Sequence, residues 1–89
     1  MNTIKKEVAV VTGAGGTLCS ALAIELGQKG YDVVLMGRSM DKLLKTEQTI
    51  KAAGGNAFSV ACDVRNLEEV RKAHDLINKT LGPCSILIN

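Results

Sequence analysis

The residues best suited to chemistry form a glycine turn near the N-terminus, within residues 10–16 (VVTGAGG). The turn follows an apolar run and precedes a segment with helical spacing. Glycine lets backbone N–H groups approach a ligand closely, and the N-terminus of a helix carries a partial positive charge. Strand, glycine turn and helix in this order are typical of a pyrophosphate site. The alternative is a glycine-rich turn that binds nothing.

A second candidate group follows the apolar run at residues 33–36. In sites that prefer NAD, an acidic residue at the end of this strand binds the ribose hydroxyls. Here the acid, Asp32, stands at the beginning of the run, and Gly37, Arg38 and Ser39 follow its end. Because a guanidinium can donate two parallel hydrogen bonds to a phosphate, we predict NADP rather than NAD. The alternative is that Arg38 is a solvated surface charge.

A third group, Asp63 and Val64, follows the apolar run at residues 57–61. The carboxyl ends of parallel strands meet at one edge of a sheet, where ligands bind. We therefore expect the Asp63 carboxylate to accept a hydrogen bond from an adenine amino group, with Val64 against the ring. The alternative is that Asp63 caps the next turn. Asn89 ends the apolar run at residues 86–88 and is expected at the same edge.

Alternating strands and helices must position these residues. Three of the four apolar runs, at residues 8–11, 33–36 and 86–88, are continuous, as in parallel strands covered on both faces. Helical spacing predicts helices over residues 17–29, from Ser39 as N-cap to residue 53, and from Asn66, where Glu69 completes a capping box. The order predicts an α/β fold with a parallel sheet and flanking helices, β-α-β-α-β-α-β.

The apolar positions of each predicted helix recur at helical spacing, and those of the second helix are expected to face inward. They are Leu18, Ala21, Leu22 and Leu26 in the first helix, Met40, Leu43, Leu44 and Ile50 in the second, and Leu67, Val70, Ala73, Ile77 and Leu81 in the third.

Composition argues against several classes of protein. The 89 residues are 46% hydrophobic and 22% charged, which is typical of a globular protein. The net charge of +2 is too small to predict binding to nucleic acid or to a membrane surface. The three cysteines lack metal-ligand spacing, so no metal site is predicted. Without a signal peptide or an apolar run that could span a bilayer, we expect a cytoplasmic protein with free thiols.

In order and spacing, four of these groups together resemble the short-chain dehydrogenase/reductase family. They are Thr12-Gly13 with the following glycines, Arg38, Asp63-Val64 and Leu87-Ile88-Asn89. The resemblance covers essentially the whole chain and implies a Rossmann-type fold, with strand order 3-2-1-4 and NADP or NAD as cofactor.

The resemblance also implies a role for each matching residue. Thr12 is among the cofactor-binding residues; Gly13, Gly15, Gly16, Thr17 and Leu18 line the phosphates; Arg38 and Ser39 approach the adenosine ribose or its 2′-phosphate; Asp63 and Val64 hold adenine; and Asn89 begins an Asn-Asn-Ala-Gly-like segment that supports the sheet and the cofactor.

The glycine turn departs from the common family pattern, Thr-Gly-x-x-x-Gly-x-Gly. Thr17 and Cys19 occupy the last two glycine positions, and Gly16 comes one step early. The string Gly-Gly-x-Leu-Cys-Ser resembles the sugar-acid branch of the family, the fructuronate reductases, also called mannonate oxidoreductases. It indicates a keto or hydroxy sugar acid as substrate.

The family's catalytic Ser, Tyr and Lys match no position of this chain. Tyr31 lies at a helix-to-strand turn on the wrong edge, and Cys19 and His74 are interpreted as a small buried residue and a helix-face residue. We therefore assign no catalytic residue. We expect residues 1–89 to be the N-terminal part of a single NAD(P)-binding Rossmann domain, whose remainder is absent, and the chain alone to be inactive.

The predicted function is that of an NAD(P)-dependent oxidoreductase that interconverts a carbonyl and a secondary alcohol, with the complete protein a homo-oligomer. Two alternatives stay open. One is a non-catalytic nucleotide-binding or interaction fragment, and the other is a ketoacyl or general carbonyl reductase of the same family.

Overall fold

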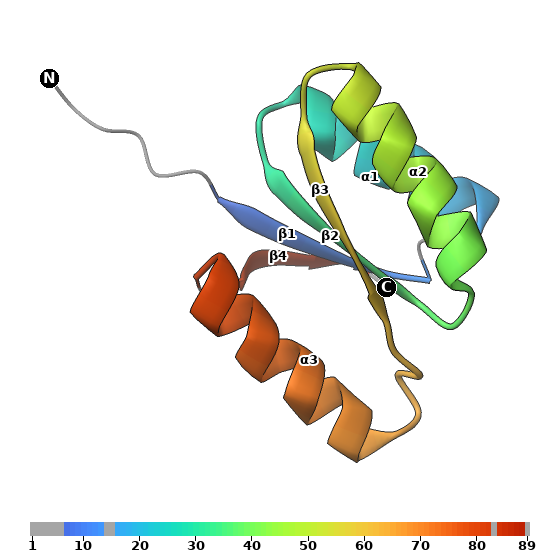
Figure 1. The fold of residues 1–89 in the computed structure, drawn as a ribbon. Helices are drawn as coiled ribbons and strands as arrows, with labels where there is room; N and C mark the ends of the chain where they lie inside the picture. The colour runs from blue at the N-terminus through green and yellow to red at the C-terminus, as the bar shows by residue number, and fades with distance from the viewer. Residues whose placement is uncertain (1–6, 14–15, 83, 89) are drawn as a thin grey trace, which may run out of the picture.

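Four parallel strands form one sheet with helices on both faces in a computed structural model of the protein, which describes residues 7–13, 16–82 and 84–88 (Figure 1). The elements in chain order are β1 (Val8–Thr12), α1 (Thr17–Gln28), β2 (Asp32–Gly37), α2 (Met40–Ala52), β3 (Asn56–Ala61), α3 (Leu67–Thr80) and β4 (Cys84–Ile88). The strand order is β3-β2-β1-β4, which confirms the predicted topology.

The register of the sheet brings the carboxyl ends of the strands to one edge. Thr12 of β1 pairs with Met36 of β2, and Gly37 at the end of β2 pairs with Ala61 at the end of β3. Asp32 lies at the opposite edge, where its Oδ1 accepts a hydrogen bond of 3.1 Å from Asn56 Nδ2. The segments that follow β1, β2 and β3 therefore lie side by side at the edge where a ligand is expected.

Two apolar cores cover the two faces of the sheet. Helices α1 and α2 pack on one face and α3 on the other (Figure 1). Because successive residues of a strand point to opposite faces, Val11 and Leu35 belong to the first core, whereas Val10 and Val34 belong to the second. This double burial explains why β1 and β2 read as continuous apolar runs. Among the described residues, no helix has the length and apolar character needed to cross a bilayer.

The structure corrects part of the predicted helix faces. Leu43, Ile50, Ala73 and Ile77 are buried as expected. Met40 and Leu44, which were predicted to face inward, are exposed instead. Leu18 and Ala21 of the first helix and Leu67 of the third, which recur at helical spacing, are exposed as well. Leu18, Met40 and Leu67 stand in the first turns of their helices, near the ligand edge of the sheet. In α2 only a narrow stripe with a spacing of three to four residues is buried, so the positions beside it face solvent.

Two glycines let α1, α2 and the turn after α2 approach closely around Ile50. A Cβ atom at Gly27 would lie 2.7 Å from Ile50 Cγ2, and one at Gly55 would lie 2.8 Å from the same atom. Ile50 is 1% exposed, and its Cγ2 branches next to the backbone, so it has little freedom to move away. Glycine is therefore needed at these positions for packing.

A Gly27→Ala variant is expected to lose about 1 kcal/mol of unfolding free energy. Overpacking costs about 1–3 kcal/mol, and the higher helix propensity of alanine returns up to about 1 kcal/mol. Thermal and urea unfolding of the protein measure the change. Gln28→Ala, at the next and exposed position of α1, is the control and should stay within about 0.5 kcal/mol of wild type. A Gly27→Ala protein as stable as wild type would refute the packing role.

Candidate functional site

The turn after β1 is built from glycines for two different reasons. Gly13 adopts a φ of 66°, a conformation that residues with side chains rarely adopt. The Gly16 N–H donates a 3.0 Å hydrogen bond to the Gly13 carbonyl, which closes the turn just before α1. A Cβ atom at Gly16 would lie 3.4 Å from that carbonyl oxygen. At Gly13 a Cβ atom would meet no other group within 4 Å, so it would project into open space.

The N-terminus of α1 is left without a side-chain cap. Its N-cap residue is Gly16, and no acidic residue lies in the first turn. In contrast, α3 begins with Asn66, whose Oδ1 accepts hydrogen bonds from the N–H groups of Glu68 and Glu69. The first N–H groups of any helix lack acceptors within the helix and carry its positive partial charge. At α1 these donors suit an anion.

A cavity of about 220 Å³ lies where β1, β2 and β3 end. The residues that line it are Gly13, Gly37, Arg38, Cys62, Asp63, Val64 and Arg65. It therefore brings together Gly13, Arg38, Asp63 and Val64, which the sequence placed in three separate parts of one predicted site. The structure adds Arg65, which sequence reasoning missed.

Gly37 has a packing role besides its place in the cavity. A Cβ atom there would lie 3.2 Å from Leu43 Cδ2, so a glycine allows α2 to pack tightly against the end of β2. The Gly37 carbonyl also accepts a 2.8 Å hydrogen bond from the Cys62 N–H, which extends the pairing of β2 and β3 to the cavity.

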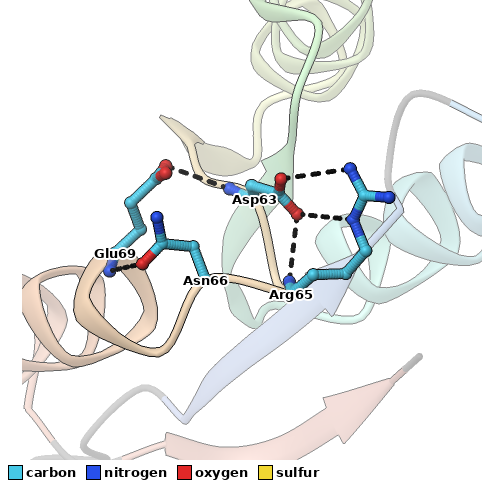
Figure 2. Close-up of polar contacts among 4 residues, drawn as sticks. All are labelled: Asp63, Arg65, Asn66 and Glu69. Carbon is cyan, nitrogen blue, oxygen red and sulfur yellow. Dashed lines mark hydrogen bonds and ion pairs between the residues drawn. The ribbon is translucent and has the colours of Figure 1, made fainter.

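Asp63 and Arg65, which both line the cavity, form an ion pair with each other (Figure 2). Asp63 Oδ1 accepts hydrogen bonds from the Arg65 N–H at 3.0 Å and from Arg65 Nε at 3.1 Å, and Oδ2 accepts one from Arg65 Nη2 at 3.2 Å. These hydrogen bonds hold the pKa of Asp63 below its ordinary value, and the charge of Arg38 acts in the same direction. The predicted alternative, in which Asp63 caps the turn, is therefore confirmed.

Only the N-cap part of the predicted capping box of α3 forms. Asn66 is the N-cap and binds the first N–H groups of the helix, as expected. Glu69, however, accepts a 3.2 Å hydrogen bond from the Asp63 N–H instead of turning back to Asn66 (Figure 2). The Asn66 N–H donates to the Asp63 carbonyl at 2.9 Å. Glu69 thus ties the first turn of α3 to the end of β3.

The other predicted site residues that the structure describes do not line this cavity, and two more lie outside the described part of the chain. Thr12 Oγ1 donates a 3.2 Å hydrogen bond to the Ile88 carbonyl and joins β1 to β4. Thr17 and Leu18 are exposed at the start of α1, and Leu18 is 74% exposed. Ser39 is exposed and is the N-cap of α2, as predicted, but its side chain makes no capping hydrogen bond. Gly15 and Asn89 lie outside the described residues.

A larger hollow of about 290 Å³ lies between the sheet and α3. Apolar side chains such as Val10, Met36 and Leu87 line it, with His74 and Asn78 from α3 among its few polar groups. Asn78 Nδ2 lies 3.3 Å from the His74 ring nitrogens, and His74 faces solvent as a helix-face residue. With no Arg or Lys among its lining residues, this hollow suits a phosphorylated ligand less well than the smaller cavity.

Cys62 and Cys19 pack against the two apolar cores. Burial raises the pKa of the Cys62 thiol, and the nearby charges of Glu69 and Asp63 raise it further. Cys62 is therefore a packing residue rather than a reactive thiol. Cys19 is partly buried against the core under α1 and α2. No cluster of three or more metal-ligating side chains occurs among residues 7–13, 16–82 and 84–88.

A parallel sheet with helices on both faces, and a glycine turn leading from β1 into α1, defines a dinucleotide-binding α/β fold. Residues 7–89 match the family model described as short chain dehydrogenase. The chain belongs to the short-chain dehydrogenase family, as the sequence motifs predicted.

Three relatives illustrate the similarity. The oxidoreductase UxuB of Bacillus subtilis is 39% identical over 83 residues, covering 93% of this chain and 30% of that protein. A metagenomic short-chain oxidoreductase in complex with NADP is 40% identical, with a TM-score of 0.88 over 91% of this chain and 37% of that one. A protein described as a D-mannonate oxidoreductase from Haemophilus influenzae, with bound NAD, is 31% identical, with a TM-score of 0.87 over 91% of this chain and 29% of that one. The chain thus spans 29% to 37% of the length of these relatives.

Proposed function

We propose that this chain binds NADP in preference to NAD and is the cofactor-binding part of an oxidoreductase that interconverts a carbonyl and a secondary alcohol. The observation that carries the proposal is the cavity that gathers the Gly13 backbone, the Arg38 guanidinium and the Asp63 carboxylate where β1, β2 and β3 end. The NADP and NAD bound to the two solved relatives support the same class of ligand.

The residues of the cavity fit such a cofactor. The space beside Gly13, which a Cβ atom would enter, lies next to the uncapped N-terminus of α1, so a pyrophosphate could reach the helix N–H groups. Arg38 would hold the 2′-phosphate, and Asp63 and Val64 would hold adenine. Bound NADP would supply or accept the hydride, whereas these residues bind and orient it.

The preference for NADP rests on the two ends of β2. Arg38 directly follows the strand and lines the cavity, whereas Asp32 starts the strand at the far edge and is bonded to Asn56. An acid in that position cannot bind the ribose hydroxyls or repel a 2′-phosphate at the cavity. The Arg38 guanidinium is therefore the proposed partner of the 2′-phosphate, which NADP carries and NAD lacks.

The substrate is the finer part of the proposal. The Gly-Gly-x-Leu-Cys-Ser string and the similarity to a D-mannonate oxidoreductase favour a keto or hydroxy sugar acid. No residue of the chain is assigned to proton transfer, since Tyr31 precedes β2 at the opposite edge. We therefore propose that the 89 residues bind the cofactor but do not turn over a substrate. A homo-oligomer of the complete protein and a cytoplasmic location stay predictions.

Calorimetric titration of the protein with NADP and with NAD tests the proposal. We expect saturable binding of both, with NADP the tighter ligand. Absence of binding by either nucleotide would refute the cofactor site. Tighter binding of NAD would refute the predicted preference alone.

A Gly13→Ala variant is expected to bind NADP about tenfold more weakly than wild type, because its methyl group would enter the space next to the phosphates. The same change forces a side chain into a positive φ and should lower stability by about 1 kcal/mol. Gly54→Ala is the matched control, because Gly54 has a φ of 90° and open space around its Cβ position, but lies in the turn between α2 and β3. It should lower the melting temperature without lowering affinity. Equal affinity losses in both variants would show that Gly13 acts through stability only.

A further inference from the structure

We propose that Arg65 orients the Asp63 carboxylate to recognise the base of the cofactor, so that the pair selects a purine that carries a 6-amino group. The inference rests on the proposed function, because it assigns a role within that binding site. Arg65 is a positioning residue in this scheme, and Asp63 makes the contact with the base.

The hydrogen bonds of Arg65 leave the carboxylate a single direction in which to accept another donor. A carboxylate has about four lone-pair positions, two on each oxygen. Asp63 Oδ1 already accepts from the Arg65 N–H and from Nε, and Oδ2 accepts from Nη2. One lone pair of Oδ2 is therefore left for a ligand, and the fork of the guanidinium fixes where it points.

The backbone of Asp63 is held independently of Arg65. Its N–H donates to Glu69 Oε1 (Figure 2), and its carbonyl accepts from the Asn66 N–H, so the end of β3 is tied to the start of α3. The terminal torsion of an aspartate is otherwise broad. The position of the carboxylate is therefore set by the turn, and its orientation by Arg65.

Both side chains line the cavity in which Arg38 and Val64 also lie. A base that enters beside Asp63 meets a negatively charged acceptor at a fixed angle. The 6-amino group of adenine is a donor and satisfies it. The 6-keto oxygen of hypoxanthine is an acceptor and is repelled, because it brings lone pairs against lone pairs.

A purely structural role accounts less well for the ion pair of Asp63 and Arg65. The Arg65 side chain is 72% exposed and that of Asp63 is 29% exposed. Ion pairs this accessible to water contribute little to stability. A lysine would keep the charge but would lose the planar fork, so it separates orientation from charge.

Titrations with NADP and with its hypoxanthine analogue, deamino-NADP, test the proposal. Wild type is expected to prefer NADP about tenfold, as for the loss of one charge-assisted hydrogen bond. Arg65→Ala should reduce the preference to less than about twofold, and Arg65→Lys should restore only part of it. Arg71→Ala, which removes an exposed arginine of α3 that does not line the cavity, is the matched control and should behave as wild type.

The outcomes separate this proposal from the one on which it rests. If wild type binds neither nucleotide, both proposals fail. If it binds both nucleotides equally, or if Arg65→Ala keeps the full preference, the role of Arg65 is refuted and the cofactor site stands. Melting temperatures of all variants, expected within a few degrees of wild type, show whether a lost preference reflects unfolding.

Discussion

An Arg38→Ala variant is expected to bind NADP about thirtyfold more weakly than wild type and to keep its affinity for NAD. Hydrogen bonds to a charged group contribute about 1.5–3 kcal/mol, and this range corresponds to factors of about ten to more than a hundred. Arg38 is exposed at the cavity wall, so solvent weakens the interaction and the middle of the range is the better estimate. Calorimetric titration with both nucleotides measures the ratio of affinities.

Two further measurements sharpen the Arg38 result. Arg38→Lys keeps a cation without the planar fork and should recover part of the NADP preference. The preference of wild type should also fall as salt rises, because an exposed ion pair is screened. An unchanged ratio of NADP to NAD affinity in Arg38→Ala would mean that Arg38 is only a solvated charge, the alternative that the sequence left open.

The parallel sheet could be predicted from the sequence because double burial leaves a direct signal. Strands covered on both faces must be apolar at successive positions, and β1 and β2 have this pattern. Gly13, Arg38 and Asp63 each follow a different strand, and parallel strands end at one edge. Fold class and the approximate location of the candidate site therefore follow from order and spacing alone.

Details of helix burial could not be predicted in the same way. Helical spacing shows which residues share a face, but not how far the sheet extends beneath it. Leu18 and Leu67 begin their helices near the ligand edge, where they are 74% and 64% exposed. An apolar residue in the first turn of such a helix therefore does not indicate a buried position. Leu18 lies next to the expected phosphate site.

Arg65 illustrates why part of the candidate site was missed. Asp63 and Arg65 lie two positions apart in a turn, and only the turn conformation decides whether the arginine folds back. The available signal was local: an aspartate after a strand readily bonds the N–H two residues on, and this brings the side chain of that residue close. From the sequence this signal stands only as the alternative to adenine binding. In the scheme proposed above the two roles are compatible, because one lone pair of Oδ2 is left for the base.

A Leu43→Ala variant is expected to lose about 2–5 kcal/mol of unfolding free energy, the largest stability change among these predictions. Leu43 is fully buried in the core under α1 and α2, and its Cδ2 lies against Gly37 at the end of β2. Removal of this side chain leaves a void between α2 and the strand that carries Arg38 into the cavity. Urea unfolding measures the loss, and NADP affinity should fall as well if the protein stays folded.

Two control variants accompany Leu43→Ala. One changes the next residue of α2, and the other changes Leu43 itself to a residue of similar volume. Leu44→Ala removes an identical side chain that is 40% exposed, and it should cost less than about 1 kcal/mol. If Leu43→Ala fails to fold, Leu43→Met tests the packing instead, because a swap that conserves volume costs less than about 1.5 kcal/mol. Equal losses for Leu43→Ala and Leu44→Ala would contradict the buried stripe of α2. A folded Leu43→Ala with unchanged NADP affinity would show that the end of β2 holds Arg38 in place without support from α2.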